Sequence, residues 1–156
     1  MEENFCGSGE GKGKDAFTSG YELTWTTNPT QYDNQYFKNL VDLPWREFTG
    51  LSGKKHWVVN LTDAAYIPEA PLAHSDGTED IGMFTTDIAL IQDEEYKKIV
   101  DEYAANNDKF LNDFAAAWYK LTTRDVGPRT RCSNDDAPPA QDWQVNYNTY
   151  IILYSI

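Results

Sequence analysis

Histidine and cysteine, two side chains that often ligate transition metals or take part in catalysis, are scarce in this sequence. The chain carries two histidines, His56 and His74, and two cysteines. His74 lies near Asp76, Glu79 and Asp80, which makes a weak candidate for a metal cluster. That spacing matches no zinc-binding template, so we favour an acidic, solvated loop. His56 lies at the edge of an expected strand, and we predict a structural role for it.

The net charge of the chain indicates which kinds of partner to expect, and its cysteines indicate the kind of compartment. A net charge of −12 argues against a nucleic-acid partner, because phosphates would be repelled. Cys6 and Cys132 form no visible disulfide framework, so we favour free thiols in a reducing compartment over a pairing. The acidic start shows no signal-peptide pattern, and no apolar run is long enough to cross a bilayer.

The sequence predicts a mainly helical chain with long loops, and these elements must position the candidate residues. Residues 1–20 are rich in Gly, Lys and Ser and predict an irregular lead-in. Apolar residues at helical spacing, with Asp or Asn as caps, predict four helices: residues 33–42, residues 86–92, a helix from Asp93 that includes Tyr103, and a helix from Asn107 or Asp108 up to Gly127. The Trp-Val-Val run in 56–61 predicts a strand, and the prolines and glycines of 62–82 predict a long loop.

We expect these elements to bury an aromatic and aliphatic core. Its predicted members are Trp25, Phe37, Leu40, Trp57, Ile88, Leu90, Ile99, Phe110, Phe114, Trp118 and Leu121. The final segment begins at Tyr150, ends at Ile156 and is strongly apolar. An exposed apolar strand favours aggregation, so this tail is expected either to pack back on the domain or to dock on a partner.

Three motifs, in order along the chain, resemble class I haem peroxidases, and catalase-peroxidases in particular. They read TSGYELTWTTNPTQYDNQYF at 18–37, MFTTDIALIQD at 83–93 and KLTTRDVGP at 120–128. The resemblance spans roughly residues 7–143 and is shared with cytochrome c peroxidase and ascorbate peroxidase. It implies a mainly α fold, the proximal-side half of a haem peroxidase with long ordered loops and a short β element. Residues 21–128 would form the peroxidase-like proximal domain, and residues 129–156 a divergent, extended docking segment.

The resemblance assigns proximal-side positions to Trp25, Asp87 and Arg124. In the family, the carboxylate matching Asp87 accepts a hydrogen bond from the iron-ligating histidine, and the tryptophan matching Trp25 donates to that carboxylate. The matching arginine tunes catalase activity. From the residues alone, Asp87 is a helix cap, Trp25 a core side chain and Arg124 a cation near a helix C-terminus. We expect vestigial residues, with a Trp25–Asp87 hydrogen bond that satisfies both groups without haem.

Thr26, Asn28 and Asp33 are similar to a proximal cation site of some ascorbate peroxidases. Their hydroxyl, amide and carboxylate oxygens on one tight loop suit a hard cation such as K⁺ or Ca²⁺. From the residues alone we favour an Asx-type turn, with Asp33 capping the next helix.

The resemblance also implies which groups lie outside these motifs. The family's distal arginine and histidine and its iron-ligating histidine precede the region that corresponds to residue 7. We therefore expect no haem in this chain alone and predict a pseudoenzyme, a non-catalytic accessory or structural subunit of a larger complex, for example in an organelle. Protein subunits would bind the face left by the missing half and the tail from Tyr150 to Ile156. Bacterial, mitochondrial and chloroplast locations all remain open.

The alternative is an enzyme fragment. It would be the C-terminal part of an active, catalase-peroxidase-like haem enzyme that reduces hydrogen peroxide, with the distal half on another segment or chain. Haem would then be the cofactor, with Trp25 and Asp87 on its proximal side.

Overall fold

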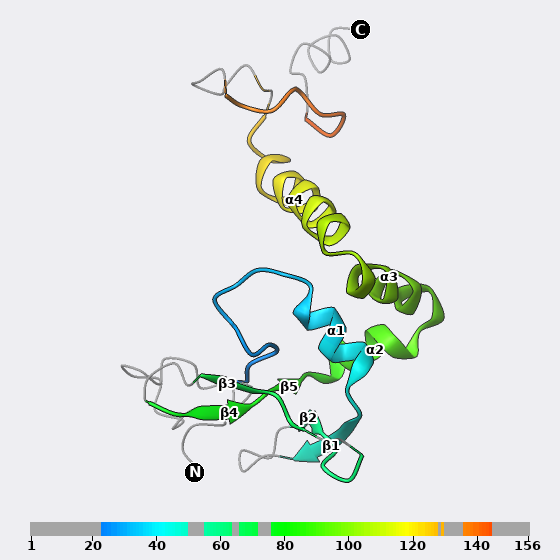
Figure 1. Ribbon diagram of the computed structural model, residues 1–156. Helices are drawn as coiled ribbons and strands as arrows, with labels where there is room; N and C mark the ends of the chain where they lie inside the picture. The colour runs from blue at the N-terminus through cyan, green and yellow to red at the C-terminus, as the bar shows by residue number, and fades with distance from the viewer. Residues whose placement is uncertain are drawn as a thin grey trace, which may run out of the picture. The chain divides into compact units, whose positions relative to one another are not determined.

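Four helices and five short strands make up the regular structure of the described residues (Figure 1). The computed structural model describes residues 23–49, 55–63, 66–71, 76–127, 129 and 136–144. The chain divides into two compact units, residues 1–110 and 111–156. The predictions about Cys6, Cys132, His74 and the tail from Tyr150 to Ile156 lie outside the described residues.

The helices confirm the mainly α class and most of the predicted elements. They are α1 (Gln35–Asp42), α2 (Thr85–Gln92), α3 (Glu94–Ala105) and α4 (Asn107–Thr123). Asp93 caps α3 as predicted, because its side chain accepts the backbone N–H groups of Glu95 and Tyr96. The predicted cap of α1 was wrong by one residue: Asn34 is the N-cap, while Asp33 Oδ1 accepts the Gln35 N–H at 2.8 Å in an Asx-type turn.

The strands form two small antiparallel sheets. Strands β1 (Trp45–Thr49), β2 (Lys55–Val59) and β5 (Gly82–Met83) pair in the order β1-β2-β5. Strands β3 (Glu69–Pro71) and β4 (Thr78–Asp80) form a second pair. The prediction of one long loop over 62–82 was therefore wrong, and β1 was not predicted. These strands are two to five residues long, too short for alternation to distinguish them from loop.

The core of the first unit lies between the helices and the sheet. One buried cluster contains Leu40, Met83, Ile88 and Val100, and a second contains Val59, Ala70 and Ile81. Of the predicted core, Leu40, Ile88 and Phe110 are buried, and Phe37, Trp57 and Leu90 are partly buried.

Five predicted core residues are exposed instead: Trp25, Ile99, Phe114, Trp118 and Leu121. Spacing along a helix identifies an apolar face, but it does not say whether another element covers that face. On α4 the side chains of Phe114 and Trp118 stack on each other at a centroid distance of 6.0 Å and remain exposed.

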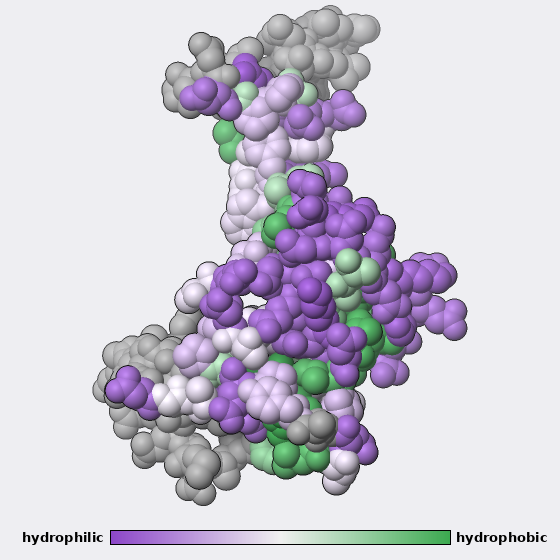
Figure 2. Space-filling model, in the orientation of Figure 1, coloured by the Kyte–Doolittle hydropathy of each residue, from purple (hydrophilic) through white to green (hydrophobic). Residues whose placement is uncertain are grey.

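The N-terminus of α1 is tied to the end of α3 by one buried side chain. Asn34 Nδ2 donates to the Tyr103 and Ala104 carbonyl oxygens, each at 2.9 Å. Those carbonyls belong to the last turn of α3, where helix geometry leaves them without helical partners. Figure 2 shows hydrophilic side chains gathered over this region on the face in view. Among the described residues, no helix is long and apolar enough to span a membrane.

The domain boundaries at 20/21 and 128/129 stay predictions. The structural division instead falls within α4, after Phe110.

Candidate functional site

One carboxylate, that of Asp87, gathers hydrogen bonds from three separate parts of the first unit. Its Oδ2 accepts the Trp25 indole N–H at 2.8 Å and the Phe84 backbone N–H at 2.7 Å. Its Oδ1 accepts the Tyr36 hydroxyl at 2.7 Å. These lengths are those of charge-assisted hydrogen bonds. The predicted Trp25–Asp87 hydrogen bond is confirmed, and the tyrosine is an additional donor.

The sequence at the start of α2 fixes where this carboxylate points. The N-cap is Phe84, and Asp87 is the third residue of the helix, from which its side chain reaches back to the N-cap backbone N–H. The expectation that Thr86 or Asp87 itself opens the helix was therefore wrong. An acidic group in this first turn also interacts favourably with the helix dipole. Asp87 is thus both a capping residue and the centre of the cluster.

Trp25 is held against Asp87 by contacts of its neighbours with the sheet. The Gly82 N–H donates to the Thr24 carbonyl at 2.9 Å, and the Thr24 hydroxyl donates to Glu79 Oε1 at 2.7 Å. A Cβ at Gly82 would lie 3.2 Å from the Trp57 carbonyl oxygen, so glycine permits this close approach. The Asn39 amide of α1 donates to the Trp25 carbonyl at 3.0 Å.

The aromatic rings around Asp87 are in edge-to-face contact. The Trp25 ring meets Phe84 at a centroid distance of 5.4 Å and Tyr36 at 6.4 Å, both nearly perpendicular. Trp25 is 40% exposed, so one side of the cluster is open. It was predicted in the core, and its exposure leaves the indole accessible to another molecule or segment.

Tyr36 is the member of the cluster that sequence reasoning missed. It falls within the 18–37 motif, but nothing in its spacing signals a partner 51 residues away. Burial raises the pKa of its phenol far above the usual value, and the hydrogen bond and negative charge of Asp87 raise it further. Burial and the Asp87 carboxylate thus both favour the protonated phenol, the form that donates to Asp87.

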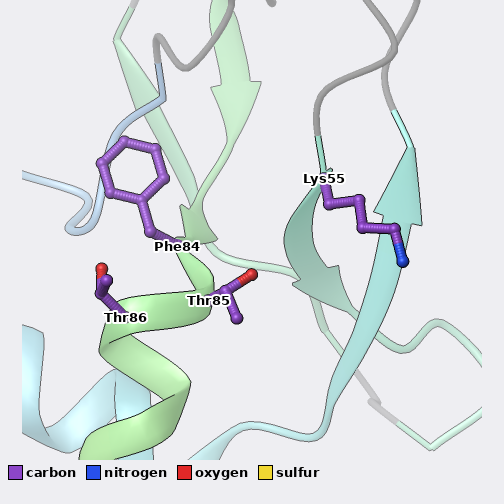
Figure 3. A pocket seen from close by; sticks show the side chains of 4 residues that line it. All are labelled: Lys55, Phe84, Thr85 and Thr86. Carbon is purple, nitrogen blue, oxygen red and sulfur yellow. The ribbon is translucent and has the colours of Figure 1, made fainter.

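An open pocket of about 360 Å³ lies beside the cluster, lined by Lys55, Phe84, Thr85 and Thr86. Figure 3 shows Thr85 pointing toward the hairpin that carries Lys55, while Phe84 and Thr86 point to the other side. The Lys55 amine forms an ion pair with Glu47 at 2.9 Å. The volume is at the small end for cofactor sites, so these residues offer one wall rather than an enclosed cavity.

The cluster fits haem indirectly, through the imidazole that would ligate the haem iron and donate its N–H to Asp87. Asp87 Oδ1 accepts one hydrogen bond among the described residues, and a carboxylate oxygen can accept two, so one further N–H donor can be accommodated. His56 cannot supply it: the Trp57 indole donates to Thr85 of α2 at 3.3 Å, and neighbouring residues of a strand point to opposite faces. His56 is instead buried against Phe48 at the hairpin.

The candidate cation ligands take part in local turns. The Asn28 side chain accepts from the Thr30 hydroxyl at 3.1 Å and donates to Gln31, so it serves a turn. With the Asp33 Asx-type turn, two of the three proposed cation ligands have local partners, and a cation at Thr26, Asn28 and Asp33 stays a prediction.

Arg124 follows the end of α4 and is exposed. It belongs to the second unit, whereas Asp87 belongs to the first. In the part of the chain that the structure describes, no three His, Cys, Asp or Glu side chains gather as a metal site.

Comparison with known proteins agrees with this geometry. The peroxidase family model matches residues 1–106. The catalase-peroxidase of Burkholderia multivorans is 44% identical over 132 residues, which cover 83% of this chain and 17% of the relative. Those of Flavobacterium johnsoniae and Shewanella baltica (strain OS155) are 43% and 42% identical over 83% and 86% of this chain. The chain thus spans less than a fifth of the length of these curated relatives. By this match, the chain belongs to the peroxidase family, and over most of its length it is similar to catalase-peroxidases.

Proposed function

We propose that this chain provides the proximal wall of a haem peroxidase that reduces hydrogen peroxide. In that role Asp87 accepts the N–H of the iron-ligating imidazole, which comes from a segment other than the described residues. The Trp25–Asp87 hydrogen bond of 2.8 Å, in a chain of this family, is the observation that carries the proposal.

Each residue of the cluster has a distinct task in this proposal. The two N–H groups on Oδ2 hold the carboxylate in one orientation, so that Oδ1 faces the incoming donor. A carboxylate that accepts an imidazole N–H fixes the ring tautomer and increases the basicity of the metal-binding nitrogen. The half-exposed Trp25 ring would pack beside that imidazole. Haem, when bound, supplies the iron that reacts with peroxide.

The proposal is tested by adding haem and free imidazole to the full chain. Imidazole stands in for the histidine, and the growth of the Soret band reports its affinity. We expect Asp87→Asn to weaken imidazole binding by about tenfold or more, because lost partners of metal ligands typically have effects of that size.

Asp93→Asn is the matched control, since among the described residues Asp93 accepts from backbone N–H groups at the start of α3, and Asn caps helices about equally well. The proposal fails if the Soret band of haem with imidazole is the same in the presence and in the absence of the chain. It also fails if Asp87→Asn binds imidazole as tightly as Asp93→Asn does.

A second candidate is a non-catalytic accessory subunit. It is favoured by the fact that three internal donors already satisfy Asp87, so the cluster can form without an imidazole. Exposed apolar side chains on α4 are also consistent with a protein partner that covers them. Failure to bind haem, together with recovery of the chain in a larger complex of defined mass, supports this candidate. Peroxide-dependent oxidation of a phenolic donor by the haem-loaded chain contradicts it.

A further inference from the structure

Besides accepting a hydrogen bond from an imidazole, Asp87 is placed to accept a proton from an oxidised aromatic side chain. Two oxidisable rings, the indole of Trp25 and the phenol of Tyr36, donate to the same carboxylate at 2.8 and 2.7 Å. A phenol that loses an electron becomes a strong acid, so its oxidation is easy only where a base can take the proton at once. Asp87 is such a base, already within proton-transfer distance.

We propose that Tyr36 is a redox-active tyrosine whose phenolic proton passes to Asp87 Oδ1 when the ring loses an electron. The O–H bond of Tyr36 breaks, the proton forms a new O–H bond on Asp87, and one electron leaves to a one-electron oxidant, which is reduced. A neutral tyrosyl radical remains, hydrogen-bonded to the protonated carboxyl group. Reduction by an outside electron donor reverses each of these changes.

The two oxygens of Asp87 are unequal, which identifies the accepting atom. Oδ2 already accepts two N–H groups, from Trp25 and Phe84, and each donor lowers the basicity of that oxygen. Among the described residues, Oδ1 accepts one hydrogen bond, from the Tyr36 hydroxyl, which leaves it one acceptor position. The more basic oxygen therefore faces the phenol, so the proton has a short path that requires no rearrangement of the backbone.

An oxidant in solution can oxidise Tyr36 through Trp25, whose ring lies at the open side of the cluster. Its ring is 40% exposed and lies 6.4 Å from that of Tyr36, centroid to centroid. A positive charge placed on the indole can therefore pass to the phenol over a short distance. The indole N–H and the phenol compete for one carboxylate, which takes a single proton, and the phenol releases its proton more readily on oxidation. The radical should therefore settle on Tyr36.

The use of this tyrosine as an electron relay in peroxide reduction rests on the proposed function, whereas its redox chemistry can be measured without haem. The full chain is oxidised by a photogenerated ruthenium(III) polypyridyl complex, and the radicals are followed by transient absorption and electron paramagnetic resonance. Tyr36→Phe removes a single hydroxyl and is compared with Tyr96→Phe, which alters an exposed tyrosine on α3.

We expect a long-lived tyrosyl signal in the wild type and in Tyr96→Phe, and its loss in Tyr36→Phe. The formation of the signal should slow in deuterium oxide, and Asp87→Asn should abolish it while Asp93→Asn keeps it. Equal tyrosyl yield and lifetime in Tyr36→Phe and Tyr96→Phe would overturn the inference. A tyrosyl signal in a chain that binds no haem would leave Tyr36 chemistry intact and refute only the peroxidase role.

Discussion

Replacing Asp87 by asparagine or by alanine should give two clearly different losses of stability. In Asp87→Asn the amide oxygen can take the place of Oδ2 and accept the Trp25 and Phe84 N–H groups. The amide NH₂ then faces Tyr36, whose hydroxyl can rotate and accept instead of donating. All three contacts survive, but as neutral hydrogen bonds of about half the strength. Asp87→Ala removes all three.

The structure sets the size of the difference. Hydrogen bonds to a charged group contribute about 1.5–3 kcal/mol each when buried, and the exposure of Trp25 reduces this to about 1 kcal/mol per bond here. We therefore expect a loss of about 3 kcal/mol in the free energy of unfolding for Asp87→Ala and about 1–1.5 kcal/mol for Asp87→Asn.

Urea unfolding followed by far-ultraviolet circular dichroism measures both losses without relying on tryptophan fluorescence, which the substitutions themselves would change. The same pair of substitutions at Asp93 is the control, with an expected loss of about 1 kcal/mol for Ala and nearly none for Asn. Losses for Asp87→Asn and Asp87→Ala that agree within about 0.5 kcal/mol would refute the shared-carboxylate geometry.

Three further predictions concern the scaffold of the cluster. Leu40→Ala should lower the free energy of unfolding by about 2–5 kcal/mol because Leu40 is fully buried, whereas Leu121→Ala, at an exposed position, should change it by less than about 0.5 kcal/mol in the same urea titration. Asn34→Ala should lower the free energy of unfolding by about 1–3 kcal/mol, because two carbonyl groups of α3 lose their donor. Amide hydrogen exchange in the last turn of α3 should become faster. Unchanged exchange there would argue against the role of Asn34 in holding α1 to α3. The raised pKa of Tyr36 predicts that its stabilising contribution is complete below pH 10.0, the ordinary pKa of a tyrosine, and is lost as pH rises further, because the unfolded chain then releases the proton first. Stability measured above that pH should therefore fall more steeply in wild type than in Tyr36→Phe, and parallel curves would contradict it.

The sequence predicted those parts of the site that depend on helix caps, helical periodicity and family motifs. The helix beginning after Asp93, the helix that starts at Asn107 and the Trp25–Asp87 hydrogen bond all followed from caps, periodicity and family motifs. The Trp25–Asp87 pair was predictable because two of the family motifs, 18–37 and 83–93, each carry one of its residues. Tyr36 was not, because its hydroxyl meets Asp87 only after α1 and α2 pack together, and a tyrosine on an apolar helix face has no sequence signal for such a partner.

The errors in the core have a different physical origin. Phe114, Trp118 and Leu121 lie at helical spacing and were predicted as buried, yet their side chains are exposed on α4. Periodicity describes one helix, whereas burial depends on a second surface that the sequence of the helix does not contain. Short strands such as β3 and β4 were missed because pairing between segments, rather than the segment itself, gives them their structure.

The role proposed for Asp87 can be measured as the strength of its hydrogen bond to a haem-bound imidazole. Resonance Raman spectroscopy of the full chain with ferrous haem and imidazole gives the iron–imidazole stretching frequency, which rises as the imidazole N–H is more strongly accepted. We predict a higher frequency in wild type and in Asp93→Asn than in Asp87→Asn. The same frequency in all three proteins would show that Asp87 does not accept a hydrogen bond from the imidazole, and would contradict its role as the proximal carboxylate.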